Sequence, residues 1–202
     1  MMTSPENSPQ PEIPSETSSE GLTTTQATSN TLGAWFADLF ETILLAVVLF
    51  VGINLVSARI RVESISMEPT LNPGEFLIVN KLAYRFGEMQ RGDVVVFFYP
   101  LDPSQRFIKR LIGLPGDEVV VSDGKVFING QPIKEPYISA PPTYMGTWQV
   151  PVDSVFVLGD NRNRSADSHV WGMVPLNYVI GKAIFIYWPM DRFGTVPGSL
   201  SF

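Results

Sequence analysis

Two serines and one lysine are the residues of this chain best suited to catalysis. Ser64 and Ser66 lie two residues apart in the segment SISMEPT, and Lys109 lies in the segment RFIKRLIG. A serine hydroxyl becomes a nucleophile when a neighbouring base takes its proton. The chain contains one histidine, His169, and no cysteine, so a Cys/His pair is excluded and a Ser–His–Asp triad has only one possible centre. The pattern indicates a serine hydrolase in which Lys109 is the general base.

The two serines are expected to divide the work. If residues 61–66 form a strand, the period of two places Ser64 and Ser66 on one face, and the apolar residue after each serine on the other. Ser66 would be the nucleophile, in a turn stiffened by Pro69. Ser64 would donate a hydrogen bond to the oxyanion, together with the backbone N–H of Ser66. The alternative is that both serines are only turn residues before a proline.

Lys109 can act as a base only if it is buried. Lowering an amine pKa from about 10.4 to about 7.4 costs the charged form roughly 4 kcal/mol, so its surroundings must be dry and apolar. Phe107 and Leu111 share the strand face of Lys109, which suits burial. Arg110 lies on the opposite face, so one of the two cations must point outward or have a partner. Arginine keeps its proton, so a base here is Lys109; the alternative is a surface lysine whose stem packs on the strand.

The segments that must position these residues read as mainly antiparallel β structure. After residue 60, short apolar runs are broken by Gly, Pro, Asn and Asp at intervals of about ten residues. The predicted strands are 76–80, 93–99, 107–113, 118–130, 154–160 and 178–188. Within 118–130, Asp123 and Gly124 are typical of a type I′ hairpin turn. Residues 81–86 could form a helical turn, which we leave open.

A hydrophobic segment precedes the predicted β domain. Residues 42–58 are 17 consecutive residues without a charge, about 25 Å of helix against a hydrocarbon core of about 30 Å. Leu39 and Phe40 extend the run, and Trp35 and Phe36 suit the interface. We predict one transmembrane helix within an anchoring segment 32–58. The alternative, a buried core helix, normally shows a polar stripe, and a cleavable signal peptide would have a basic leading region.

The remaining composition excludes several classes of protein. Residues 1–31 are rich in Ser, Thr, Pro, Glu and Gln and are expected to form a disordered tail, which leaves 59–202 as the catalytic domain. The net charge of −6 and the absence of a basic cluster exclude nucleic acid as a partner. The chain has no glycine-rich phosphate loop, metal-ligand spacing or internal repeat. We therefore expect neither a cofactor nor a metal site.

Four motifs follow one another in a recognisable order. They are SMEPTL (66–71), RGDVVVF (91–97), KRLIGLPGD (109–117) and GDNRNRSADSHVWG (159–172). With them the chain resembles the type I signal peptidases, the leader peptidases of the Ser/Lys class, from about residue 38 to residue 188. The fold this implies is an all-β domain of mainly antiparallel sheets, with an apolar surface next to the membrane, following a single N-terminal transmembrane helix.

The resemblance implies roles for individual residues. Ser66 is the nucleophile, Lys109 the general base and Ser64 the hydroxyl of the oxyanion hole. Ser165 falls where the family has a serine that hydrogen-bonds to the lysine and orients it. Four further residues are given a structural role behind the site, where their charges can satisfy one another: Asp160, Asn161, Arg162 and Asp167.

The last motif departs from the commonest bacterial form. His169 stands where many bacterial members carry arginine. A histidine at this position resembles the cyanobacterial and plastid branch of the family. We expect His169 to pair with Asp167 as a structural substitution. Asn163 and Arg164 also differ from the commonest form of this motif.

The implied function is the removal of signal peptides from exported preproteins, after small residues at positions −1 and −3. The cleavage segment would bind extended, like an added strand. The expected partners are preprotein signal peptides, the lipid bilayer and the translocation machinery, and the anchor would raise the effective concentration of substrate. The family's placement is the plasma or thylakoid membrane, with a cytoplasmic tail and a periplasmic or lumenal catalytic domain. Arg59 and Arg61, directly after the helix, argue for the opposite orientation.

Two rival functions are compatible with parts of the sequence. One is a self-cleaving repressor-type peptidase with similar Ser/Lys chemistry, although the tail has no room for a DNA-binding domain. The other is a catalytically silent envelope domain on an anchor. Such a domain would be free to lose Ser66 or Lys109, and both are present.

Overall fold

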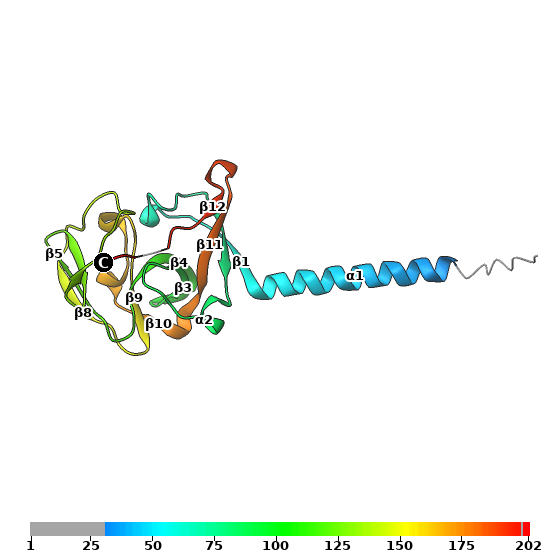
Figure 1. Cartoon of the computed structure of the whole chain (residues 1–202), viewed down its shortest axis with the longest axis horizontal. Coiled ribbons are helices and arrows are strands. Elements are labelled where there is room, and N and C mark those ends of the chain that lie inside the picture. The colour runs from blue at the N-terminus through cyan, green and yellow to red at the C-terminus, as the bar shows by residue number, and fades with distance from the viewer. Residues whose placement is uncertain (1–30, 199) are drawn as a thin grey trace, which may run out of the picture. The chain divides into compact units, whose positions relative to one another are not determined.

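The computed structural model describes residues 31–198 and 200–202, so all but the last residue of the expected tail lies outside the described residues. The chain divides into two units, Met1–Leu44 and Leu45–Phe202. The first helix, α1 (Thr31–Val56), begins in the first unit and ends in the second (Figure 1).

Helix α1 is long and apolar enough, over Gly33–Val56, to cross a membrane. Its large apolar side chains are exposed rather than packed against protein, which is not the environment of a core helix. Two of its polar side chains bond to its own backbone: Thr42 donates to the carbonyl of Asp38 and Asn54 to that of Phe50, each at 2.8 Å. These bonds satisfy the polar groups without solvent, as an apolar environment requires.

The helix ends two residues before the predicted limit of the anchoring segment. Ser57 and Ala58, predicted to belong to the anchor, instead begin strand β1 (Ser57–Arg61). Lys81 caps the helix end, because its backbone N–H donates to the carbonyl of Val56 and its Nζ donates to that of Asn54, both at 2.9 Å. A cation at this position also complements the negative end of the helix dipole.

Two antiparallel sheets form the second unit. The larger has the order β1-β2-β11-β3-β4-β9-β10, with β12 paired to β11. Its remaining strands are β2 (Phe76–Asn80), β3 (Val94–Tyr99), β4 (Asp102–Gly113), β9 (Ser154–Leu158), β10 (Val174–Pro175), β11 (Val179–Trp188) and β12 (Gly194–Thr195). The mainly antiparallel β prediction is confirmed.

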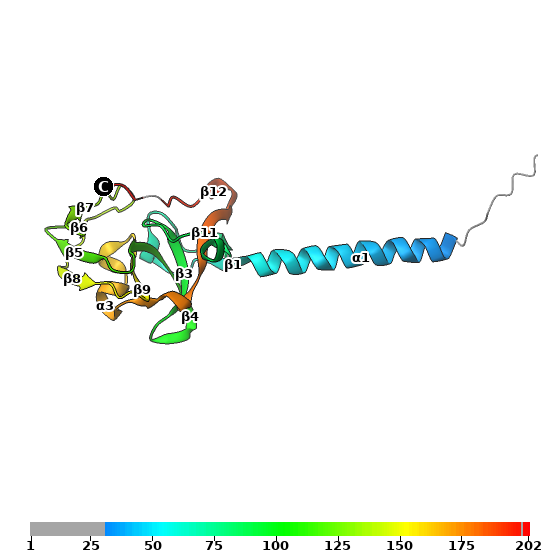
Figure 2. The same ribbon diagram turned by 60° about the horizontal axis from the view of Figure 1, so that its bottom comes forward.

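The smaller sheet has the order β7-β6-β5-β8. Its strands are β5 (Glu118–Ser122), β6 (Lys125–Ile128), β7 (Gln131–Pro132) and β8 (Gly146–Gln149). The helical elements between strands are short: α2 (Ala83–Phe86), α3 (Ser168–Trp171) and the 3₁₀ turns η1 (Ile65–Met67), η2 (Arg162–Arg164), η3 (Leu176–Tyr178) and η4 (Met190–Arg192). Figure 2 shows the smaller sheet apart from β11 and from the hairpin that joins β3 to β4.

Most predicted strands are present with small shifts. Strand β2 has the predicted bounds, and the Asp123-Gly124 turn has positive φ values of 50° and 71°, as a type I′ turn requires. The open question at 81–86 is answered by α2. Strand β4 begins five residues earlier than predicted, at Asp102. Four strands of two to four residues were missed (β7, β8, β10 and β12), because alternation cannot be read over so few positions.

The apolar core lies on both sides of β3. Val94 and Val96 pack in one cluster, with the inner face of β2 and β11, while Val95 and Phe97 pack in another, with β9. A strand that is buried on both faces reads as a continuous apolar run. A third cluster joins the smaller sheet to β9.

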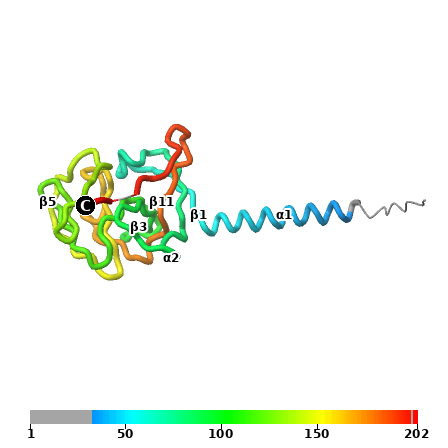
Figure 3. Tube along the Cα trace, in the orientation of Figure 1, coloured from blue at the N-terminus to red at the C-terminus, as the bar shows by residue number. Residues whose placement is uncertain are grey.

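The C-terminal segment connects the two sheets. It leaves β12 on the larger sheet and crosses toward the smaller one (Figure 3). Just after β7, the N–H of Lys134 donates to the carbonyl of Ser201 at 2.8 Å. On the way, the carbonyl of Pro197 accepts a hydrogen bond from Arg110 at 2.9 Å. The segment is therefore tied to the strand that carries Lys109.

Candidate active site

Ser64, Ser66 and Lys109 meet at one point in the structure. Lys109 Nζ lies 2.5 Å from Ser66 Oγ, and Ser64 Oγ lies 3.0 Å from Ser66 Oγ. Ser66 is on η1 and Lys109 on β4, 43 residues apart in the chain. All three line a cavity of about 440 Å³, formed by residues 60–66, 105–109, Val96, Arg164 and Ala166.

The predicted strand around Ser66 is wrong. Strand β1 ends at Arg61, and Ser66 lies in the 3₁₀ turn η1, which the Glu68 N–H closes by donating to the Ile65 carbonyl at 3.2 Å. Ile65 lines the same cavity as the serines rather than pointing away. Met67 is fully buried in the core. Burying this one large side chain turns the chain inward, so the two hydroxyls meet through a tight turn and not through strand alternation.

The turn that carries Ser66 is held by the loop after β9. Asn161 donates its backbone N–H to the carbonyl of Ser66 at 3.0 Å and its side-chain amide to that of Ile65 at 3.1 Å. The loop can approach this closely because residue 159 is glycine. A Cβ on Gly159 would lie 2.4 Å from the Ser66 carbonyl oxygen and 2.2 Å from Ser165 Oγ. Gly159 thus has a part in the site that we did not predict; the signal was a glycine directly after a buried strand.

Lys109 is buried, with 4% of its surface exposed. Desolvation lowers the pKa of its amine from 10.5 to about 8, and the negative charges of Asp167 and Asp160 act in the opposite direction. Neither carboxylate forms an ion pair with it: among the residues that the structure describes, no ion pair involves Lys109. A buried amine that lacks a paired carboxylate favours its neutral form.

Ser165 is buried beside this pair, with 8% of its surface exposed. Its Oγ has no hydrogen-bond partner within the described part of the chain. The expected bond from Ser165 to the lysine is therefore not formed in this structure. The hydroxyl instead lies against Gly159.

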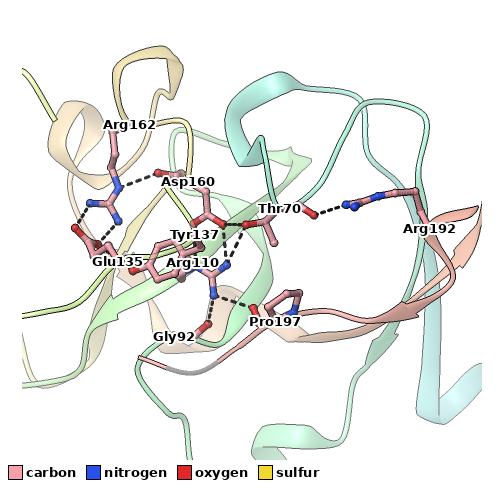
Figure 4. Close-up of polar contacts among 10 residues, drawn as sticks. Thr70, Gly92, Arg110, Glu135, Tyr137, Asp160, Arg162, Arg192 and Pro197 are labelled. Atoms are coloured by element: carbon pink, nitrogen blue, oxygen red, sulfur yellow. Dashed lines mark hydrogen bonds and ion pairs between the residues drawn. The ribbon is translucent and has the colours of Figure 1, made fainter. Parts of the chain in front are cut away.

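Arg110 is also buried, but it is fully paired (Figure 4). Its Nε and Nη2 donate to the two carboxylate oxygens of Asp160 at 2.8 and 2.7 Å, and its Nη1 donates to the Gly92 carbonyl at 2.8 Å. The guanidinium lies 4.0 Å from the centre of the Tyr137 ring. Asp160 also accepts from Thr70 Oγ1 at 2.5 Å. Of the two expected outcomes, that one of the cations points outward or that one has a partner, the second is found, at Arg110.

Arg162 pairs with a carboxylate outside the four residues that were expected behind the site. It forms an ion pair with Glu135, and its Nε donates to the carbonyl of Gly159 at 3.1 Å. Of the two carboxylates expected behind the site, neither Asp160 nor Asp167 pairs with Arg162, and Asp160 pairs with Arg110 instead. Glu135 and Tyr137 were missed because they lie in a proline-rich segment outside any periodic pattern.

Asp167 is fully buried and is held by Gly159 and by the ring and backbone of His169. One oxygen accepts from the Gly159 N–H at 2.9 Å, and the other lies 2.6 Å from Nδ1 of His169. The His169 ring is stacked on Tyr144, with 3.8 Å between ring centres and 5° between planes. The expected contact of His169 with Asp167 is present, and Tyr144 was not foreseen.

The arrangement has the parts of a serine nucleophile with an amine base. A buried amine with a lowered pKa lies within hydrogen-bond reach of one hydroxyl, and a second hydroxyl stands beside it. The N–H of Ser66 lies in the first turn of η1, where backbone donors have no intrahelical acceptor. No group of His, Asp and Glu side chains that could hold a metal ion occurs among the described residues.

Comparison with known proteins places these residues in a family. The family described as "Signal peptidase, peptidase S26" matches residues 35–188. The signal peptidase I of Leptolyngbya laminosa is 49% identical over 164 residues, which cover 76% of this chain and 80% of that protein. The probable signal peptidase I-2 of Synechocystis sp. is 47% identical over 165 residues, covering 78% and 75%.

Plant and structural relatives are also found. Thylakoidal processing peptidase 1 of Arabidopsis thaliana is 39% identical over 142 residues, which cover 65% of this chain and 42% of that protein. A crystal structure of a signal peptidase I from Enterococcus faecalis is 36% identical, with a TM-score of 0.45, and covers 48% of this chain and 97% of its own.

Proposed function

This chain belongs to peptidase family S26, the signal peptidases, and we propose that Ser66 and Lys109 carry out its cleavage of signal peptides from preproteins. The observation that carries the proposal is the 2.5 Å contact between Ser66 Oγ and the buried, carboxylate-free amine of Lys109. A lysine that only stabilised the fold would be expected to have a paired carboxylate, as Arg110 has in Asp160.

The proposed reaction has two halves. The neutral amine of Lys109 takes the proton of Ser66 as Oγ attacks the carbonyl carbon of the scissile bond. The oxyanion that forms accepts hydrogen bonds from the Ser64 hydroxyl and the Ser66 N–H. Lys109, now an ammonium, gives its proton to the leaving amine, and the mature protein departs. Lys109 then takes a proton from water, whose oxygen attacks the acyl-enzyme carbonyl carbon. As the ester bond breaks, Lys109 returns this proton to Ser66 Oγ, and the signal peptide leaves with a new carboxylate.

The cleavage segment is proposed to bind as an added strand. Strand β1 lies at the end of the larger sheet, so its outer edge has unpaired backbone groups. Residues 60–64 and 105–109 flank the cavity that ends at Ser66. A peptide extended between them would form main-chain hydrogen bonds, while the apolar residues Ile65, Val96 and Ile108 limit the room for its side chains. This geometry suits small residues at positions −1 and −3.

The helix and the family together fit a membrane protein. We propose that the tail is cytoplasmic and the catalytic domain periplasmic or lumenal, in the plasma or thylakoid membrane, where preproteins emerge from the translocation machinery. Arg59 and Arg61 argue less strongly against this orientation than the sequence suggested. They lie in β1, paired to β2, and so belong to a large folded domain. Positive charges orient short loops more than folded domains.

Cleavage of a preprotein with an Ala-X-Ala site tests the proposal. The full-length protein in detergent is compared with Ser66→Ala and Lys109→Ala, with Ser122→Ala and Lys125→Ala on the exposed β5–β6 hairpin as matched controls. We expect cleavage at the signal junction by the native protein and both controls, and none by the two site variants if they remain folded. An inert native protein would favour a silent envelope domain, whereas Ser66→Ala or Lys109→Ala proteins that still cleave would show that the assigned dyad is wrong. Labelling of Ser66 by a serine-directed inhibitor separates a reactive serine from a silent one.

A further inference from the structure

Charged side chains are unevenly distributed around the cleft that ends at Ser66. Besides Lys109, the charged residues that line it are three arginines and one carboxylate: Arg61, Arg106, Arg164 and Glu63. The whole chain, by contrast, has a net charge of −6. The cleft is therefore a positive region in an acidic protein.

These three arginines have no partner of their own. None of them forms an ion pair or a side-chain hydrogen bond with the residues that the structure describes, and the guanidinium of Arg61 only approaches the Phe76 ring, at 5.9 Å. Arg110 and Arg162, which support the site from behind, are both paired with carboxylates. The cleft arginines keep all their donors available to whatever enters.

We propose that this cleft prefers cleavage segments that carry an acidic side chain near the bond to be cut. The inference rests on the proposed function and adds a substrate class to it. A guanidinium presents two parallel N–H donors to a carboxylate, which gives orientation as well as attraction. A cleft lined by one sign of charge also raises the local concentration of oppositely charged ligands.

The position of the acidic residue follows from the spacing along the two segments. Arg106 precedes Lys109 by three residues on β4, which is about 10 Å along a strand. Arg61 precedes Ser66 by five residues. Strands β1 and β4 run in the same direction, because four successive antiparallel pairings separate them. Both lead to the contact between Ser66 and Lys109, so Arg61 and Arg106 lie on the same arm of the cleft. An extended substrate would bring its acidic residue to this arm about three to five residues from the cut, on one side only.

Anionic lipid headgroups are the competing ligand for unpaired arginines. The substrate is favoured because the three residues line the cavity together with Ser66 and Lys109, so they meet the chain that is to be cut. A lipid site would need the arginines but would show no dependence on the peptide. The experiment must therefore vary the peptide and the lipid separately.

The test is a set of Ala-X-Ala peptides in which one position at a time, up to six residues on either side of the cut, carries Glu, Gln or Lys. kcat/KM is measured with the full-length protein in a neutral detergent, at low and high salt. We expect Glu to exceed Gln by about three- to tenfold at positions three to five on one side, and Lys to fall below Gln. The preference should shrink at high salt. Equal rates for Glu and Gln at every position would overturn the proposal.

Variants identify the residues responsible. Arg61→Gln, Arg106→Gln and Arg164→Gln should each lower the Glu-to-Gln ratio by about two- to threefold, the triple variant should abolish it, and Glu63→Gln should raise it. Arg85→Gln, an exposed arginine on α2 outside the cleft, should leave the ratio unchanged. A preference that survives in the triple variant contradicts the proposal. So does a triple variant that loses binding to anionic vesicles while the native protein shows no peptide preference.

A failure of the proposed cleavage and a failure of the proposed charge preference give different results. Cleavage of the Gln peptides by the native protein supports the proposed function whatever the Glu-to-Gln ratio. If no peptide is cut, binding of the same peptides to the Ser66→Ala protein, measured by fluorescence anisotropy, still compares Glu with Gln. Tighter binding of the Glu peptides that the triple variant loses supports the charge preference, and equal binding overturns it.

Discussion

Lys109 and Arg110 are neighbours on β4 and both are buried, yet their surroundings are opposite. Arg110 has the Asp160 carboxylate, two backbone carbonyls and the face of Tyr137 around it. Lys109 has the Ser66 hydroxyl and the Phe107 ring, whose centre is 5.6 Å from Nζ, and no paired carboxylate. One strand therefore carries a permanent cation on one side and an amine able to lose its charge on the other.

The difference follows from what each side chain can do when it is desolvated. A buried guanidinium keeps its proton, so it must be compensated by an anion. A buried amine can release its proton instead, and becomes a base when it does. Arg110, which is paired, thus holds the loop of Asp160 in place. Lys109, which has no paired carboxylate, is available as a base.

The largest effect is expected when Lys109 is given the side chain of its neighbour Arg110. Lys109→Arg keeps the charge but cannot act as a base, so kcat/KM should fall by about three to four orders of magnitude. The variant should also lose stability, because its guanidinium is buried without an anion. Lys125→Arg on the β5–β6 hairpin is the control for the substitution itself. A Lys109→Arg protein with near-native kcat/KM would show that Lys109 is not the base.

The second prediction removes the cation that has a partner. Arg110→Met leaves the buried Asp160 without its ion pair and should destabilise the protein by about 3 to 5 kcal/mol in denaturant unfolding. Arg110→Met combined with Asp160→Leu removes both charges and should recover most of that loss. If the double variant is no more stable than the single one, packing rather than charge pairing explains the contribution of Arg110.

The third prediction concerns the pH dependence caused by Lys109. Its pKa is lowered from 10.5 to about 8 by burial, so the stability it contributes is fully present above pH 10.5 and is lost as pH falls to about 8. The loss amounts to about 3 kcal/mol. Lys109→Met should therefore be the more stable protein below pH 8, although inactive, and its stability should lack this rise with pH. If the free energies of unfolding of the native and Lys109→Met proteins change with pH in the same way, the lowered pKa of Lys109 is contradicted.

Activity should follow the same titration. The base form of Lys109 increases as pH rises, so kcat/KM of the native protein should climb through a midpoint near its pKa of about 8.

The smallest effect is expected at His169, through its contact with Asp167. The Asp167 carboxylate raises the pKa of Lys109, against the effect of burial. His169→Arg places a permanent charge beside Asp167, so this carboxylate should attract the Lys109 proton less. The midpoint of the activity curve should move to lower pH, with kcat/KM at pH 7 rising about two- to fourfold. His169→Gln adds no charge and should keep the native midpoint. A folded but inactive His169→Arg protein would contradict a structural role for His169.

The sequence alone identified the elements with strong local signals. The long apolar run predicted α1, the short apolar run FLIVN between turn residues predicted β2, and Asp-Gly predicted the turn between β5 and β6. It also made Ser66 and Lys109 candidates, because the chain has one histidine and no cysteine and because the motifs around them resemble those of the signal peptidases. These inferences need only residue types and neighbours a few positions away, which is why they could be made without coordinates.

Only the tertiary structure decided how those residues meet. The turn at Ser66 depends on a buried Met67 and on Asn161, which lies 95 residues after Ser66. The partner of Arg162 is Glu135, not Asp160, because the segment that carries Glu135 folds over the loop after β9. Contacts between distant segments leave no periodic trace in the sequence, since they are set by how the two sheets pack and by which buried charge can reach which anion.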